Sequence, residues 1–239
     1  MLAGWRKRDP RSNEAGMKYY LMGVFASAVL LYGMSLLYGW SGSTLLSEIG
    51  TKIAEKPTPA VTLGIVFVLI GFAFKVSAVP FHAWAPDTYE GAPTPVTAFL
   101  AVSSKAAGFV AIIQIVANGL SVPSGDVWKV TTPVFFVLAV LSMTVGNLIA
   151  LRQSNVVRML AYSGIAQAGF MLAPFALLRR PAVADQIVPS VVTYLVIYAA
   201  MNLGAFAVVV AAARKTRSAE ITSFGGMFRY APGLTVAMT

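Results

Sequence analysis

The sequence predicts an all-α protein that crosses a membrane several times. Of its 239 residues, 57% are hydrophobic and 11% are charged, and its mean hydropathy is +0.73. Soluble domains carry roughly a quarter charged residues. The apolar residues fall in blocks of about 18 to 27, the length that crosses a hydrocarbon core of about 30 Å. The composition therefore excludes a disordered chain and an ordinary soluble domain.

Six apolar spans follow a polar N-terminal segment. They cover residues 16–40, 60–79, 94–120, 132–151, 155–178 and 187–213. Helices are favoured over barrel strands, because a membrane segment must satisfy its own backbone hydrogen bonds and strands would alternate with a period of two. The sequence thus predicts one membrane domain over 1–239, with loops at 1–15 and 214–233.

The connectors between the spans carry turn residues, and one of them is amphipathic. Residues 44–56 have apolar side chains at helical spacing, which predicts a short helix at the membrane interface. Residues 152–155 are expected to form a tight turn in which Ser154 or Asn155 caps the fifth span.

The basic residues indicate the orientation. With six spans, both ends of the chain lie on one side, which holds eleven basic residues against five on the other. The eleven are Arg6, Lys7, Arg8, Arg11, Lys18, Arg152, Arg158, Arg214, Lys215, Arg217 and Arg229; the five are Lys52, Lys56, Lys129, Arg179 and Arg180. The positive-inside rule therefore places both ends in the cytoplasm.

The two remaining lysines, Lys75 and Lys105, lie within spans. At 1.5 Å per residue, Lys75 is about 22 Å from the outer start of its span and Lys105 about 16 Å from the inner start of the next. A lysine at mid-bilayer costs about 2.5 to 3.5 kcal/mol, so it is by default a functional residue. Burial disfavours its charged form, as a proton relay requires. The alternative is that the lysines snorkel or pair with a carboxylate to fix helix packing.

A proline lies five residues after Lys75. Pro80 cannot donate a backbone hydrogen bond, so the helix is expected to break near Ser77, and broken helices beside ionisable groups are a device of ion transporters. Alternatively, Pro80 ends the span at the membrane surface. His82 could pass protons between water and Lys75, or it could be a hydrogen-bonded structural residue.

Further polar residues lie in the last three spans. They are Asn147, Tyr162, Ser163, Gln167, Tyr194, Tyr198 and Asn202. Interhelical hydrogen bonds account for each of them, and a hydrated wire lined by several is the alternative.

Composition also argues against other functions. The chain has no cysteine and one histidine, so we expect no metal site, no bound cofactor and no redox centre. Its net charge of +9 could suggest nucleic-acid binding, but the basic residues lie between the apolar blocks, and no nucleic-acid partner is expected.

The run from Phe74 to Val96, with Lys75, Pro80 and His82, strongly resembles the subunit N family of bacterial proton-pumping NADH-quinone oxidoreductase (complex I). The resemblance continues through Ser104-Lys105-Ala106-Ala107, Arg158 to Ser163 and Met201 to Phe206, and it covers essentially the whole chain.

The resemblance implies an antiporter-like fold of about fourteen helices, of which this chain would be a fragment holding helices six to eleven. It implies that Lys75 lies on a broken helix, so that the second span covers 60–90 with a break near Ser77 and Pro80, and that Lys105 is the connecting lysine on the next helix. It also makes His82 a participant in the proton path or its neighbour. Many relatives have a histidine at Gln167, which cannot titrate.

All nine acids lie outside the six spans. The family's glutamate on helix five and lysine on helix twelve would lie before Met1 and after Thr239, so the natural protein is expected to be longer.

The sequence therefore predicts a proton-translocating membrane subunit of NADH-quinone oxidoreductase, with Lys75 and Lys105 as the relay and Gln167, Tyr162 and Asn147 as supporting polar residues. NADH, flavin, iron-sulfur clusters and quinone would be bound by other subunits, and neighbouring antiporter-like subunits would be its partners in the bacterial plasma membrane. The alternatives are a sodium/proton antiporter subunit and a structural membrane scaffold.

Overall fold

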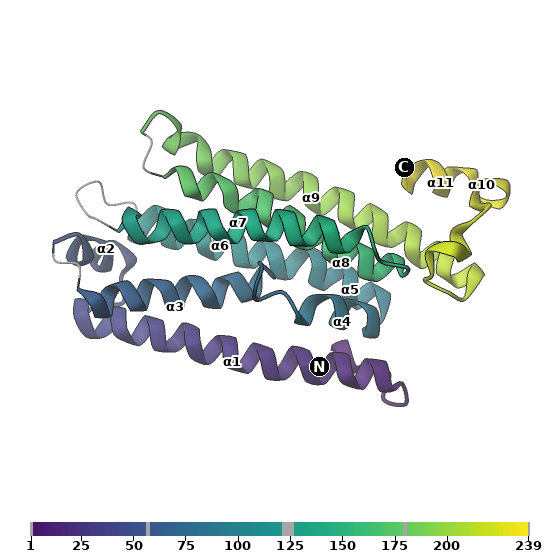
Figure 1. Ribbon diagram of the computed structural model, residues 1–239, viewed down its shortest axis with the longest axis horizontal. Coiled ribbons are helices and arrows are strands. Elements are labelled where there is room, and N and C mark those ends of the chain that lie inside the picture. Colours follow the sequence, from purple (N-terminus) through teal and green to yellow (C-terminus); the bar gives the residue numbers. More distant parts are fainter. Residues whose placement is uncertain (1, 56–57, 121–126, 179–180, 239) are drawn as a thin grey trace.

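The computed structural model describes residues 2–55, 58–120, 127–178 and 181–238 as helices that run side by side (Figure 1). In chain order they are η1 (Leu2–Gly4), α1 (Pro10–Ser41), α2 (Leu46–Glu55), α3 (Pro59–Lys75), α4 (Trp84–Gly91), α5 (Thr94–Phe99), η2 (Leu100–Ser104), α6 (Lys105–Ile115), η3 (Val116–Leu120), α7 (Trp128–Ala150), α8 (Val156–Leu172), η4 (Ala173–Leu177), α9 (Pro181–Thr216), η5 (Ile221–Phe224), α10 (Met227–Tyr230) and α11 (Pro232–Met238). No strand forms within the described ranges, which confirms the all-helical prediction.

Five helical segments of the described chain are long and apolar enough to cross a membrane. They are Pro10–Ser41, Thr94–Gly119, Trp128–Ala150, Val156–Leu177 and Asp185–Thr216. The apolar helix α3 has 17 residues, or about 26 Å at 1.5 Å per residue, which is short of a hydrocarbon core of about 30 Å. Of the six expected spans, the second thus differs from the others, because its helix stops early.

The chain is helical at both predicted end loops. α1 begins at Pro10, inside the expected loop 1–15, because Asp9 caps the helix by accepting from the Arg11 amide and Pro10 suits the first helical position. At the other end, α9 continues to Thr216, and the expected loop 214–233 contains η5 and α10. The membrane-length helices simply extend beyond their apolar stretches.

Glycines bring α1 against α3 and α7 against α8. A Cβ on Gly33 would lie 2.8 Å from the Gly64 carbonyl oxygen, and one on Gly71 would lie 2.6 Å from the Leu30 Cβ, so neither position has room for a side chain. On the other side of the bundle, a Cβ on Gly146 would lie 2.7 Å from the Ala166 amide nitrogen. Small residues at such contacts are typical of helices packed in membranes. The short helix α2, expected over 44–56, lies at the end of the bundle away from α10 and α11 (Figure 1).

The second helix is interrupted before Pro80, as the sequence predicts. α3 ends at Lys75, α4 begins at Trp84, and Ser77 has a φ of 56°. Because the proline nitrogen carries no hydrogen, it cannot donate to the carbonyl of Val76, four residues back. The Ser77 hydroxyl donates to this carbonyl instead, at 2.7 Å.

Side chains from other segments satisfy the backbone around the interruption. The Trp84 indole donates to the Phe74 carbonyl at 3.2 Å, and the Val79 amide donates to the Ser142 hydroxyl on α7 at 2.9 Å. Both hydrogen bonds are buried. The interruption is therefore held in place by the neighbouring helices.

Two carboxylates tie α4 to the first turns of α1 and α8. Asp87 accepts from Lys18 Nζ at 2.7 Å and from Arg158 Nη1 at 2.6 Å, and Glu90 accepts from the same Arg158 nitrogen at 3.1 Å. Lys18 also pairs with Glu14 at 2.5 Å. Since α4 is short, these half-buried ion pairs fix its position at the end of the bundle.

We expect Ser142→Ala to lower the free energy of unfolding by about 1 to 3 kcal/mol, because the buried Val79 amide loses its acceptor. The measurement is denaturant unfolding of the full-length protein in detergent. Ser35→Ala is the control, since the Ser35 hydroxyl donates to a backbone carbonyl on the exposed face of α1. Equal stability of the two variants would contradict the expectation.

We expect Arg158→Ala to lower the same free energy by about 1 to 2 kcal/mol, a value between those of exposed and buried ion pairs. Arg152→Ala removes an exposed arginine from the same end of the bundle and should change stability by less than about 0.5 kcal/mol. Loss of the ion pairs should also make the loss from Asp87→Asn smaller in the Arg158→Ala background than alone. Additive losses would show that the ion pairs do not act together.

Candidate functional site

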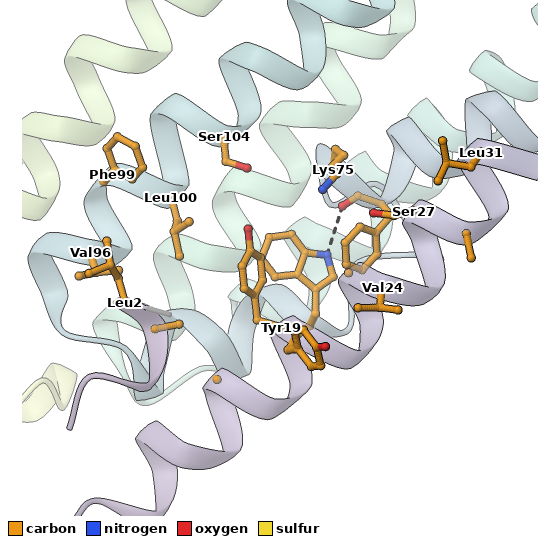
Figure 2. A pocket seen from close by; sticks show the side chains of 17 residues that line it. Leu2, Tyr19, Val24, Ser27, Leu31, Lys75, Val96, Phe99, Leu100 and Ser104 are labelled. Carbon is orange, nitrogen blue, oxygen red and sulfur yellow. Dashed lines mark hydrogen bonds between the residues drawn. The ribbon is translucent and has the colours of Figure 1, made fainter. Parts of the chain in front are cut away.

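Lys75 is the last residue of α3 and faces a cavity beside α1. The cavity has a volume of about 630 Å³ and is lined mostly by apolar side chains from α1, α5 and η2, with Tyr19, Ser27 and Ser104 among its polar groups. Figure 2 shows the Lys75 amine in this cavity, close to the bond between the Trp84 indole and the Phe74 carbonyl. The interruption of the helix therefore leaves Lys75 partly accessible at the end of an apolar helix.

Lys105 is the first residue of α6 and is buried, with 2% of its surface exposed. Its ammonium donates to the Gly164 carbonyl on α8 at 2.5 Å, and it lies 5.8 Å from the centre of the Tyr198 ring on α9. Within the described ranges, no carboxylate lies in ion-pair distance of Lys75 or Lys105. The buried amine is therefore held by a carbonyl dipole and an aromatic ring.

The two lysines lie on adjoining helices and face different ways. Gly108, one turn after Lys105, packs against the end of α3: a Cβ there would lie 2.8 Å from Val76 Cγ1 and 3.6 Å from Lys75 Cβ. Ser104, next to Lys105, lines the same cavity as Lys75. Lys75 thus faces α1, whereas Lys105 points toward α8 and α9.

His82 lies in the interruption, beside α8. Its ring is 6.4 Å from that of Tyr162 in an edge-on arrangement, and its Nδ1 atom is buried and makes no hydrogen bond to the described residues. Tyr162 is two residues before Gly164, the acceptor for Lys105. One helix therefore contacts both the histidine and the buried lysine.

The other two predicted polar residues lie differently. Gln167 accepts a hydrogen bond from the Tyr194 hydroxyl on α9. The side chain of Asn147 is exposed on the surface of α7, so the structure does not bring it to the lysines. A polar residue in an apolar span has no mark in the sequence that tells which neighbour it faces.

Sequence reasoning missed Gly164 and treated Tyr198 only as one of several polar residues. A glycine that serves through its carbonyl leaves no signal in side-chain patterns. The spacing of Tyr194, Tyr198 and Asn202 at four residues was a signal, because it places all three on one face of α9. Within the described residues, no group of histidines, cysteines or carboxylates could hold a metal ion.

Comparisons with known proteins agree with this arrangement. A family model described as "NADH:quinone oxidoreductase/Mrp antiporter, TM" matches residues 1–239. The chain is 48% identical, over its whole length and 44% of the relative's, to NAD(P)H-quinone oxidoreductase subunit 2 of Prochlorococcus marinus strain NATL2A. It thus spans less than half the length of this relative.

Two solved structures contain similar chains. One is respiratory complex I from Thermus thermophilus with bound aureothin, with a TM-score of 0.77 and 33% identity over 98% of this chain and 48% of that chain. The other is the archaeal membrane-bound sulfane sulfur reductase, with a TM-score of 0.88 and 26% identity over 99% of this chain and 47% of that chain. Because the family model covers the whole sequence, the chain belongs to the NADH:quinone oxidoreductase/Mrp antiporter transmembrane family.

Proposed function

We propose that this chain is the central part of a proton-translocating membrane subunit of an NAD(P)H-quinone oxidoreductase, of the subunit N type. The observation that carries the proposal is the placement of Lys75 and Lys105 on adjoining helices, one at the end of an interrupted helix and one buried against a carbonyl. Ionisable groups deep in a membrane protein are rare and mark ion pathways. The relatives that bear the name NAD(P)H-quinone oxidoreductase subunit 2 support the assignment.

The interrupted helix counts as one span in the proposed topology. α3 and α4 would together cross the membrane over 60–90, which brings the number of crossings to six and both ends to the cytoplasmic side of a bacterial plasma membrane. The distribution of basic residues supports this orientation. In the full protein, these six would be about helices six to eleven of fourteen.

The proposed path runs from the interruption to Lys75 and then to Lys105. Water reaches the segment between Ser77 and His82, and His82 and Tyr162 lie where they can pass a proton along it. A charge arriving from a neighbouring subunit changes the protonation of Lys75, and the proton moves to or from Lys105. Gln167 can orient water but carries no proton, and Asn147 faces outward, toward lipid or another subunit.

The electron transfer that drives the movement is assigned to other subunits. This chain would bind no cofactor, while NADH, flavin, iron-sulfur clusters and quinone would lie elsewhere in the complex. Neighbouring antiporter-like subunits would be the partners that carry the coupling.

A sodium/proton antiporter subunit is the second candidate, because the family description joins NADH:quinone oxidoreductases with Mrp antiporters. Sodium-dependent proton movement by the full protein in the absence of NADH would favour this candidate. Proton movement that requires NADH oxidation and is indifferent to sodium would favour the oxidoreductase.

We expect Lys75→Met and Lys105→Met, each in the intact complex, to assemble normally and to lower NADH-driven proton pumping by about a hundredfold, because acid–base groups typically contribute 10²–10⁴-fold. Pumping is measured in sealed vesicles with a pH-sensitive dye. Lys7→Met removes an exposed lysine and is the control. Full pumping in both span variants would refute the relay and favour a structural scaffold.

We expect His82→Ala to slow proton pumping by about tenfold, and added imidazole to restore part of the rate, since a mobile base can replace a lost proton carrier. The pumping rate is followed over a series of imidazole concentrations. A reduced rate that imidazole leaves unchanged would mean that His82 has a structural role.

A further inference from the structure

We infer that Tyr198 is a positioning residue for Lys105 and sets the place of the buried ammonium between α6, α8 and α9. The inference rests on the proposed function of Lys105, and it assigns a role to a tyrosine on α9, outside the lysine-bearing helices. Three independent features of the structure lead to it.

The first feature is the contact between the ring and the amine. Lys105 Nζ lies over the Tyr198 ring, 5.8 Å from its centre, and only 2% of each residue's surface is exposed. An ammonium within about 6 Å of a ring centre is attracted to the negative face of the ring, more strongly when water is excluded. The ring therefore stabilises the cation on the side away from Lys75.

The second feature is the anchor of the tyrosine itself. The Tyr198 hydroxyl donates to the carbonyl of Ala101 at 3.2 Å. Ala101 lies in η2, the π-helical turn that directly precedes Lys105. The Lys105 amide bonds to the Val102 carbonyl in this turn, whereas a regular α-helix would pair it with Ala101. The widened turn therefore joins the tyrosine to the same turn that carries the lysine.

The third feature is the space left by Gly164. A Cβ at this glycine would lie 2.8 Å from Lys105 Nζ and 3.0 Å from the Tyr198 hydroxyl oxygen. Both groups thus meet at one point on α8, where the carbonyl of Gly164 accepts from the ammonium. The amine is confined by three elements: a carbonyl from α8, a ring from α9 and its own helix, pinned to that ring.

Tyr194, one turn before Tyr198, provides a useful contrast. Its hydroxyl donates to Gln167, further along α8. Two tyrosines on the same face of α9 therefore bind different partners, and in the described contacts it is Tyr198 that meets the lysine.

The test uses the intact complex with Tyr198→Phe and Tyr198→Leu. Tyr198→Phe keeps the ring but loses the anchor to Ala101, and we expect protons pumped per NADH oxidised to fall about threefold to tenfold, the usual range for one hydrogen bond. Tyr198→Leu also loses the ring and should fall further. Assembly of the complex should stay at the wild-type level in both variants.

Each variant is also made in the Lys105→Met background. A positioning residue acts only through the lysine, so Tyr198→Phe should cause no further loss once the lysine is gone. Tyr32→Phe, which removes the hydroxyl of an exposed tyrosine on α1, is the matched control and should pump like the wild type. A loss from Tyr198→Phe that is undiminished in the Lys105→Met background would overturn the inference.

The outcomes separate this inference from the proposed function. If Lys105→Met itself pumps at the wild-type level, the relay fails and the positioning role fails with it. If Lys105→Met is impaired while Tyr198→Phe pumps normally, the relay stands and Tyr198 does not position the amine.

Discussion

The low polarity of the bundle interior is the constraint on which the rest of the structure depends. An amine or a free backbone group there has to find its partner within the protein, because unsatisfied polar groups in an apolar medium cost several kcal/mol. The ammonium of Lys105 finds the carbonyl of Gly164, and the backbone around Pro80 finds the side chains of Ser142 and Trp84. Each partner comes from a different part of the chain, so these polar contacts also join the helices.

Both lysines lie where regular helix geometry changes. Lys75 is the last residue of α3, directly before the interruption, and Lys105 is the first residue of α6, directly after a π-helical turn. At such places backbone carbonyls leave their usual partners and become acceptors for other groups. The irregular backbone thus supplies polarity at the two points where the apolar spans carry a charge.

The rest of the bundle is built differently and provides a firm frame. Glycine contacts bring α1 close to α3 and α7 close to α8, and ion pairs hold the short α4 at the end of the bundle. The interruption between α3 and α4 is therefore fixed at both of its ends. The proposed proton path passes through this fixed segment, beside His82 and Tyr162.

The amino-acid pattern alone determined the helical class, the positions of the apolar blocks, the interruption at Pro80 and the two unusual lysines, since each depends on residue type and local spacing. It did not determine where α1 and α9 extend beyond their apolar stretches, because polar residues continue a helix without an apolar signal.

The tertiary structure alone decided the partners. Asn147 and Tyr198 are both polar residues in apolar spans, yet one is exposed and the other meets Lys105. Gly164 serves through its backbone, which is the same for every residue type in a sequence. The physical reason is that a hydrogen-bond partner or an ion pair depends on which helix faces which, and this is settled only when the helices pack.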